Sequence, residues 1–174
     1  MLDFNGKNIA KIAVFTALSF VVSIFEFPIF AQAPFLKLDF SNVFVLIGGF
    51  SLGPIHGVII LFVKEILCLI KTSNYIGQIA NFIIGCSYVL LPTIVYYYKK
   101  GLKSVALTLS IASIIQVGVG LVVNRFINFP LFGYPISAFY ELALIISAFN
   151  LIKGVAVAIV TIILYKRIKK FLHI

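Results

Sequence analysis

Apolar residues dominate the chain in long runs that are interrupted by short polar segments. Most of these runs reach the roughly 20 residues that an α-helix needs to cross the hydrocarbon core of a bilayer. The pattern therefore predicts an all-α integral membrane protein with six transmembrane helices. The expected helices span residues 9–30, 40–52, 54–71, 76–98, 103–128 and 138–168.

A glycine–proline pair separates the second expected helix from the third. Pro54 has no backbone N–H and cannot continue a helix, whereas Gly53 tolerates the turn before it. The resulting helix at 40–52 is too short to span alone, so we expect it to begin at depth in the membrane. Non-helical backbone at that depth is tolerated where it lines protein or a cavity, and discontinuous helices point to a binding site.

Lysine and arginine residues gather in three clusters at the ends of apolar runs. These are Lys7 with Lys11, Lys99 and Lys100 with Lys103, and Lys166 and Arg167 with Lys169 and Lys170. Such residues accumulate on the cytoplasmic side of a membrane. Six spans place all three clusters on that side, whereas one span across 40–71 would put the middle cluster opposite the others. The pattern predicts cytoplasmic N- and C-termini and a multi-pass protein of the cell membrane.

The composition excludes other broad classes of protein. Hydrophobic residues make up 62% of the 174 residues and charged residues 11%, whereas a soluble domain carries about 25% charged residues. We expect residues 1–174 to form a single membrane-embedded domain. The net charge of +9 is concentrated at the ends of apolar runs rather than on a solvated face with stacking aromatics, which argues against binding of nucleic acid.

The chain carries no common catalytic or nucleotide-binding signature. It has no GxxxxGK[ST], HExxH or GxSxG motif, and no paired acids at metal-ligand spacing. Cys68 and Cys86 lie inside apolar runs without a CxxC motif, which favours small buried side chains over a metal site. We therefore expect a non-catalytic chain without a metal or a cofactor.

Several polar residues stand inside apolar runs near one expected end of the bundle. Asn150 and Lys153 are three residues apart, so they share one helix face. A lysine in a membrane helix costs about 2.5–3.5 kcal/mol on insertion scales, which makes it a candidate site residue. Asn124 and Asn81 add two amides at a similar expected depth, whereas Asn128 is expected to lie near the outer surface in solvent. The competing interpretations are a lysine that snorkels to the interface and asparagines that only join helices.

The stretch "PFLKLDFS", residues 34–41, places polar groups between two apolar runs, in the first expected outer loop. Asp39 precedes a helix, so it is expected either to cap that helix or to line a site as well. Lys37 is expected to fold inward over a ligand or to anchor at the interface. Glu26 and Glu65 are further acids in apolar context, and the sequence assigns them no role.

Ala13 and Ala17 form an A-x-x-x-A step on the first expected helix. Small residues at this spacing allow a second helix to approach closely in a membrane. The step therefore marks a candidate surface for a partner helix.

Five segments of the chain together resemble the riboflavin-binding S components of energy-coupling factor (ECF) vitamin transporters. They are "FEFP" (25–28), "PFLKLDFSNVFVLIGGFSLGP" (34–54), "ANFIIG" (80–85), "N-x5-P-L-F-G" (124–133) and "FNLIKG" (149–154). The likeness extends over nearly the whole chain in order. The block at 34–54 is typical of S components in general, whereas "FNLIKG" and the Asn124 segment resemble the riboflavin type more closely.

The resemblance implies a six-helix fold that holds the vitamin near the outer face of a bacterial plasma membrane, with the first loop as a lid. It implies that Ala13 and Ala17 meet a separate transmembrane coupling protein, which binds two ATPase subunits for ATP-driven uptake. The family's polar and lid positions match residues Leu36, Lys37, Asn124, Asn150 and Lys153, and less closely Asp39 and Asn81. Asn42 stands where the family often has an aspartate.

Riboflavin is chemically consistent with these candidate residues. Its ring suits apolar walls, and the alternating donors and acceptors of its pyrimidine edge suit side-chain amides such as Asn124 and Asn150. Lys153 is expected to donate to a ring carbonyl. A flavin phosphate would be expected to recruit more cations. The alternatives are an S component for another vitamin, such as pantothenate or folate, a membrane-embedded enzyme, and a membrane anchor or small channel.

Overall fold

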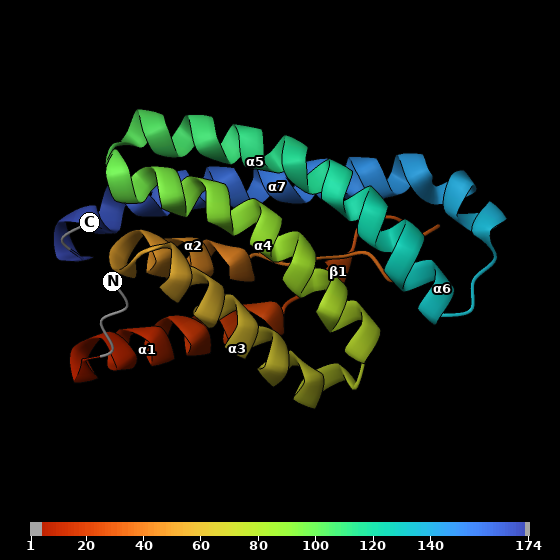
Figure 1. The fold of residues 1–174 in the computed structure, drawn as a ribbon, viewed down its shortest axis with the longest axis horizontal. Helices are drawn as coiled ribbons and strands as arrows, with labels where there is room; N and C mark the ends of the chain where they lie inside the picture. The colour runs from red at the N-terminus through yellow and green to blue at the C-terminus, as the bar shows by residue number, and fades with distance from the viewer. Residues whose placement is uncertain (1–4, 173–174) are drawn as a thin grey trace.

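The computed structural model describes residues 5–172, which form an elongated bundle of helices (Figure 1). The start of the first helix, the end of the last helix and the turn between α4 and α5 all lie at one end of the bundle. The three basic clusters of the sequence therefore share that end. The helices are α1 (Gly6–Ser23), α2 (Ser41–Leu52), α3 (Pro54–Thr72), α4 (Tyr75–Tyr98), α5 (Leu102–Val123), the π-helical turn η1 (Asn124–Asn128), α6 (Phe129–Leu131) and α7 (Ile136–Leu172).

The six predicted helices correspond to α1–α5 and α7, and the predicted break at Gly53-Pro54 is confirmed. Gly53 adopts a φ of 107°, a left-handed conformation that favours glycine. Its N–H donates to the Gly49 carbonyl at 2.8 Å, which ends α2, and Pro54 occupies the first position of α3. The local chemistry of these two residues therefore determines the break.

The first predicted helix is wrong at its C-terminal end, because α1 stops at Ser23 rather than at residue 30. The following segment, 24–40, is called here the hairpin segment. It contains the short strands β1 (Phe27–Pro28) and β2 (Lys37–Leu38), which pair antiparallel with Phe27 opposite Leu38. A residue before proline disfavours the helical conformation, which explains why the apolar run does not continue as a helix through Phe27.

The last two predicted helices also differ at their ends. The fifth does not stop at residue 128, because η1 and α6 carry it on to Leu131. The sixth is longer than predicted, from Ile136 to Leu172 rather than 138–168.

Four described helical segments are long and apolar enough to cross a membrane. They are Gly6–Ser23, Tyr75–Tyr98, Leu102–Leu131 and Ile136–Ile168. The remaining two predicted spans are α2, which has 12 residues, and α3, which contains Lys64, Glu65 and Lys71. The structure is therefore that of an all-helical membrane protein, and the count of six spans stays a prediction.

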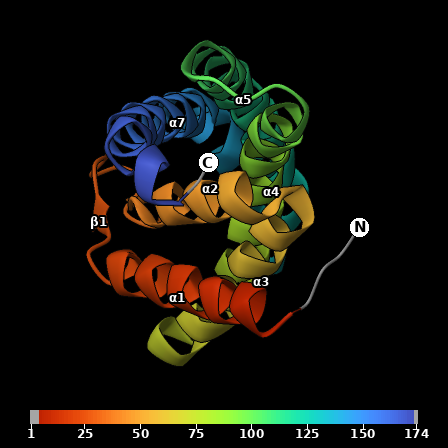
Figure 2. The same ribbon diagram turned by 90° about the vertical axis from the view of Figure 1, so that its left-hand side faces the viewer.

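The central element of the bundle is α2, which contacts α1, α3, α4 and α7 (Figure 2). Residues 43–50 of α2 are all apolar or glycine, as expected for a helix that is packed against neighbours on every side. Its residues belong to an apolar core that also includes Ile60, Leu61, Tyr88 and Val157. Gly49 and Gly57 allow α2 and α3 to approach closely, since a Cβ built on Gly57 would lie 3.2 Å from the Cα atom of Gly49.

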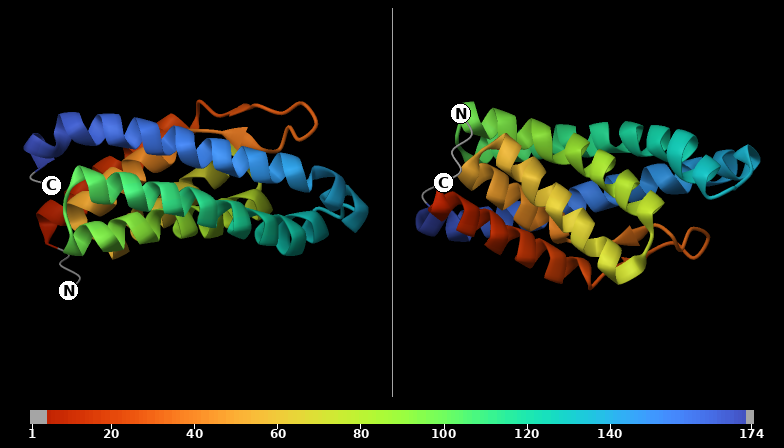
Figure 3. Two further views of the ribbon diagram at one scale, coloured as in Figure 1. Left: turned by 90° about the horizontal axis from the view of Figure 1, so that it is seen from above. Right: turned by 60° about the horizontal axis from the view of Figure 1, so that its bottom comes forward.

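A second apolar cluster holds the hairpin segment against the other end of the bundle (Figure 3). Ala33, Leu36 and Leu38 of this segment are buried among residues of α6 and α7, including Phe129 and Phe149. The hairpin segment is thus packed over the bundle end that lies away from the termini.

Candidate ligand-binding site

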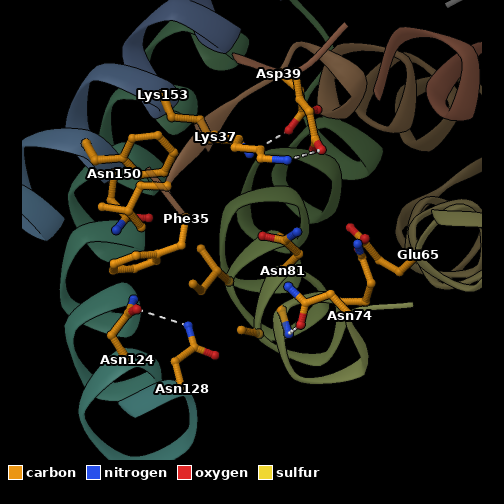
Figure 4. A pocket seen from close by; sticks show the side chains of 18 of the residues that line it. Phe35, Lys37, Asp39, Glu65, Asn74, Asn81, Asn124, Asn128, Asn150 and Lys153 are labelled. Atoms are coloured by element: carbon orange, nitrogen blue, oxygen red, sulfur yellow. Dashed lines mark hydrogen bonds and ion pairs between the residues drawn. The ribbon is translucent and has the colours of Figure 1, made fainter. Parts of the chain in front are cut away.

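A cavity of about 300 Å³ lies beneath the hairpin segment (Figure 4). One wall consists of residues from α2, α3 and α4, and the opposite wall consists of residues from α5, η1 and α7. Phe35, Leu36, Lys37 and Asp39 line it from the hairpin segment. Its volume stands at the lower end of the range of about 300–1,000 Å³ that small-molecule sites occupy.

The lining contains three lysines and three acids, and each lysine is paired with one acid. The distances between the nitrogen and oxygen atoms are 3.0 Å for Lys37 and Glu26, 2.6 Å for Lys64 and Glu65, and 2.7 Å for Lys153 and Asp39. Among the described residues, the lining therefore offers no unpaired cation to a ligand. Its formal charge is zero, which suits an uncharged ligand.

Asp39 joins the hairpin segment to the helices. Its Oδ2 atom accepts from Lys153, and its Oδ1 atom accepts from the backbone N–H of Ser41 at 2.8 Å and from the Ser41 hydroxyl. Burial would raise the pKa of this carboxyl, but the ammonium groups of Lys153 and Lys64 and these hydrogen bonds outweigh burial and hold its pKa below its usual range. Asp39 is therefore charged at neutral pH.

The predicted cap on the second helix differs in detail. Phe40, not Asp39, occupies the N-cap position of α2, and it makes no side-chain cap. Asp39 nevertheless accepts from the first N–H of the helix, that of Ser41, so it satisfies one of the donors that a helix start leaves free. Asp39 therefore lines the cavity and bonds the first N–H of α2, but it is not the N-cap residue that the sequence predicted.

Lys37 lines the cavity, but its ammonium group donates to Glu26 and its side chain is 45% exposed. Glu26 also accepts from Lys71 at 3.0 Å, so one carboxylate ties the hairpin segment to the end of α3. Leu36 is buried in the apolar cluster beside the cavity. The sequence left Glu26 without a role, and the structure makes it an ionic link at the edge of the cavity.

Amide side chains dominate the rest of the polar lining. Asn150 and Lys153 line the same cavity, in agreement with their predicted shared face. Asn150 Nδ2 donates to the Ile146 carbonyl, and Asn124 Nδ2 donates to the Gly120 carbonyl. The amides of the lining are Asn42, Asn74, Gln78, Asn81, Gln116, Asn124, Asn128 and Asn150.

Gly120 explains how Asn150 fits between α5 and α7. A Cβ built on Gly120 would lie 2.5 Å from Asn150 Nδ2, so only glycine leaves room for the amide there. Gln116 donates to the Asn150 carbonyl at 2.9 Å and links the same two helices. The side-chain amides of Gln116, Asn124 and Asn150 therefore each donate to a backbone carbonyl, and these hydrogen bonds fix their orientation.

Comparison with known proteins adds to this geometry. The family described as "ECF transporter, substrate-specific component" matches residues 7–165. The chain belongs to this family of ECF transporter S components.

Individual relatives agree with that assignment. The riboflavin transporter RibU of Staphylococcus aureus (strain TCH60) is 36% identical over 97% of this chain and 93% of its own length. The riboflavin transporter FmnP of Bacillus subtilis (strain 168) is 23% identical over 96% of this chain and 94% of its own. A solved structure of the S component of a bacterial ECF transporter has a TM-score of 0.83 at 35% identity, covering 95% of this chain and 97% of that one.

In this S component, all seven of the predicted ligand-binding residues line the cavity. One of them is Leu36, which has been described above. The other six carry polar side chains. They are Lys37, Asp39, Asn81, Asn124, Asn150 and Lys153. Their role in binding a ligand stays a prediction.

Sequence reasoning missed part of the lining. Asn128 was expected to be solvated, which is wrong: it is buried, and its Nδ2 atom donates to Asn124 Oδ1 at 2.9 Å. Glu65, Asn42, Gln78 and Gln116 were given no place in the site. A helical spacing was available as a signal, because Asn74, Gln78 and Asn81 recur at the i, i+4, i+7 interval of one helix face.

Ala13 and Ala17 lie apart from the cavity. Both are exposed on α1, next to the exposed side chains of Val14, Leu18 and Val21. This face of α1 is an exposed apolar strip with small residues in its middle, and its contact with a partner helix stays a prediction.

Proposed function

We propose that this S component is the high-affinity binding subunit for riboflavin in an ECF transporter. The observation that carries the proposal is the cavity lining, in which amides are abundant and every lysine is paired with a carboxylate. Riboflavin is uncharged, and its ring edge presents alternating donors and acceptors that amides match. The relatives named as riboflavin transporters support the same ligand.

The charge pattern disfavours the alternative vitamins. Pantothenate and folate carry carboxylates, which are recognised most strongly by charge-assisted hydrogen bonds from cations. In the described lining, the ammonium groups of Lys37, Lys64 and Lys153 already serve the protein's own acids. An anionic vitamin would have to displace one of these pairs.

The chain purified in detergent tests the ligand directly. Riboflavin added to the chain should be retained through gel filtration with a flavin absorption spectrum, and excess pantothenate or folate should not displace it. Displacement by either anionic vitamin, or absence of riboflavin binding, would overturn the proposal.

The proposed arrangement in the membrane is six spans with both termini in the cytoplasm, the cavity near the outer face and the hairpin segment as its lid. The placement of the three basic clusters at one end of the bundle supports it. Labels at residue 101 and at the C-terminus should react from the cytoplasm, and labels at 74 and 133 from outside. Labels at 101 and the C-terminus on opposite sides would contradict this topology.

The proposed partners are a transmembrane coupling protein and two ATPase subunits. The exposed step of Ala13 and Ala17 on α1 supports docking of a partner helix there. Ala13→Leu and Ala17→Leu should block riboflavin uptake in cells without changing riboflavin binding by the purified chain. Uptake that survives both replacements would remove this face from the interface.

A further inference from the structure

A groove of about 490 Å³ lies on the surface of the bundle between α4 and α5, separate from the ligand cavity. It is lined by apolar side chains and one glycine, without a polar or charged side chain. The lining includes Ile83 of α4 and Ile115, Gly118, Val119, Val122 and Phe126 of α5 and η1. A Cβ built on Gly118 would meet no atom within 4 Å, so the groove is open above this glycine.

The groove extends along α5 for about the depth of one lipid leaflet. Ile115 and Phe126 are eleven positions apart, which is about 16 Å along a helix that rises 1.5 Å per residue. One leaflet is half of a hydrocarbon core of about 30 Å. The groove belongs to the segment Leu102–Leu131, which is long and apolar enough to cross a membrane. A single acyl chain of the leaflet on the cavity side therefore matches the groove in length and polarity.

Arg125 stands beside the η1 end of this groove. Its Cζ atom lies 5.3 Å from the centroid of the Phe126 ring, which lines the groove. The same atom lies 5.9 Å from the ring centroids of Phe139 and Tyr140 on α7. Cation–π contacts with ring faces position the guanidinium without occupying its N–H donors.

The charge of Arg125 has no carboxylate partner among the described residues. The other basic residues toward the cavity end are all paired: Lys37 and Lys71 with Glu26, Lys64 with Glu65, and Lys153 with Asp39. A guanidinium presents its donors in a planar fork that suits the paired oxygens of a phosphate. Arg125 therefore offers an anion site at the end of an apolar groove.

We propose that the groove and Arg125 together bind one anionic phospholipid, with an acyl chain along α5 and the headgroup phosphate at the guanidinium. A phospholipid supplies both an apolar chain and an anion, whereas a soluble anion or an apolar helix supplies only one of them. The π-helical turn η1 connects this site to the ligand cavity. Phe126 of η1 lines the groove, whereas Asn124 and Asn128 of the same turn line the cavity. The lipid thus packs against the outer side of a turn whose inner side faces the cavity.

Native mass spectrometry of the purified chain in detergent tests the proposal. The probes are dioleoyl phosphatidylglycerol and dioleoyl phosphatidylcholine, which has the same acyl chains and no net charge. The first lipid bound to the wild-type chain should be phosphatidylglycerol, by about five-fold in affinity, the contribution of one cation at an anionic surface. Arg125→Gln should lose this preference. Gly118→Leu should lose the bound lipid itself, because the new side chain enters the groove.

Two matched controls separate the groove from the rest of the surface. Lys100→Gln removes an exposed cation at the opposite end of the bundle. Gly6→Leu enlarges an exposed glycine outside the groove, where a Cβ also meets no atom within 4 Å. Both variants should keep the wild-type preference for phosphatidylglycerol.

The contrary outcomes are distinct. Equal binding of the two lipids by the wild-type chain, or an unchanged preference in Arg125→Gln, overturns the proposal. Displacement of the lipid by glycerol 1-phosphate, which has no acyl chain, would show a simple anion site and also overturn it. Cross-linking of Gly118→Cys to another protein in the membrane would assign the groove to a partner helix instead. If Gly118→Leu does not fold, Arg125→Gln decides alone, and no outcome depends on riboflavin.

Discussion

The two ends of the bundle bury residues of opposite character. An apolar core extends toward the end that carries the termini, and its fully buried side chains include Leu46, Ile47, Ile60, Leu61 and Tyr88. Toward the other end, ion pairs and amides surround a cavity beneath the hairpin segment. One end of the fold is therefore packed solid, and the other end is hollow and polar.

The difference separates residues that stabilise the fold from residues that bind. Apolar packing stabilises a helix bundle directly, whereas a buried ion pair loses much of its Coulomb energy to desolvation and is often no better than apolar residues of the same size. The two buried pairs at the cavity, Lys64 with Glu65 and Lys153 with Asp39, are therefore poorly explained by stability alone. They are well explained by a site that must offer polar groups without a net charge.

The largest expected effect comes from breaking the pair of Lys153 and Asp39 at the polar end. Lys153→Met leaves the buried Asp39 carboxylate without its closest cation, and breaking a buried pair from one side costs about 3–5 kcal/mol. We expect a matching loss in the thermal stability of the ligand-free chain in detergent. Lys153→Met combined with Asp39→Asn should recover part of that loss, because the uncompensated charge is gone. Equal stability of Lys153→Met and wild type would contradict the buried pair.

The next effect comes from the packed end. A Cβ on Gly49 would lie 2.5 Å from Thr93 Cγ2, so Gly49→Ala forces the contact between α2 and α4 to shift. Overpacking of this kind costs about 1–3 kcal/mol of stability. Gly118→Ala is the matched control, since a Cβ there meets nothing within 4 Å. Thermal unfolding in detergent should separate the two variants, and identical melting curves would show that the packed end tolerates added volume.

An effect of similar size, on affinity rather than stability, is expected for Asn150→Ala. The change removes a donor and an acceptor from the α7 wall and leaves polar ligand atoms unpaired, at about 1–3 kcal/mol or roughly five- to 150-fold in the dissociation constant. Titration of riboflavin against the purified variant measures it. Asn8→Ala, on α1 and outside the lining, should bind as wild type does. Unchanged affinity of Asn150→Ala would make this residue a structural link between α5 and α7.

The smallest effect is expected at the rim of the cavity. Glu26→Gln weakens the ionic link of the hairpin segment to Lys71, but partly exposed pairs contribute only about 0.2–1 kcal/mol. Riboflavin release, followed by stopped-flow fluorescence, should be faster by less than about five-fold at low salt. The difference should shrink at high salt, where such pairs are screened. A release rate that is the same in both proteins at low salt would exclude Glu26 as a closing contact.

The amino-acid sequence by itself determined the features that depend on near neighbours. The order of the helices α1–α5 and α7 follows from the apolar runs, and the break before α3 follows from Gly53-Pro54, whose backbone preferences are local. The shared face of Asn150 and Lys153 follows from helical spacing alone. The same helical spacing could have predicted two further lining residues. Asn74 and Gln78 stand seven and three residues before Asn81, so they share its helix face.

Only the tertiary structure decided which distant groups meet. Lys153 pairs with Asp39, 114 positions away, and Glu26 pairs with two lysines of different segments. The π-helical turn at η1, together with the crossing of α4, η1 and α7, buries Asn128, which the sequence had left in solvent. Such contacts depend on how the helices cross and on which charges must be paired once water is excluded. Neither of these can be predicted from the spacing of neighbouring residues in the sequence.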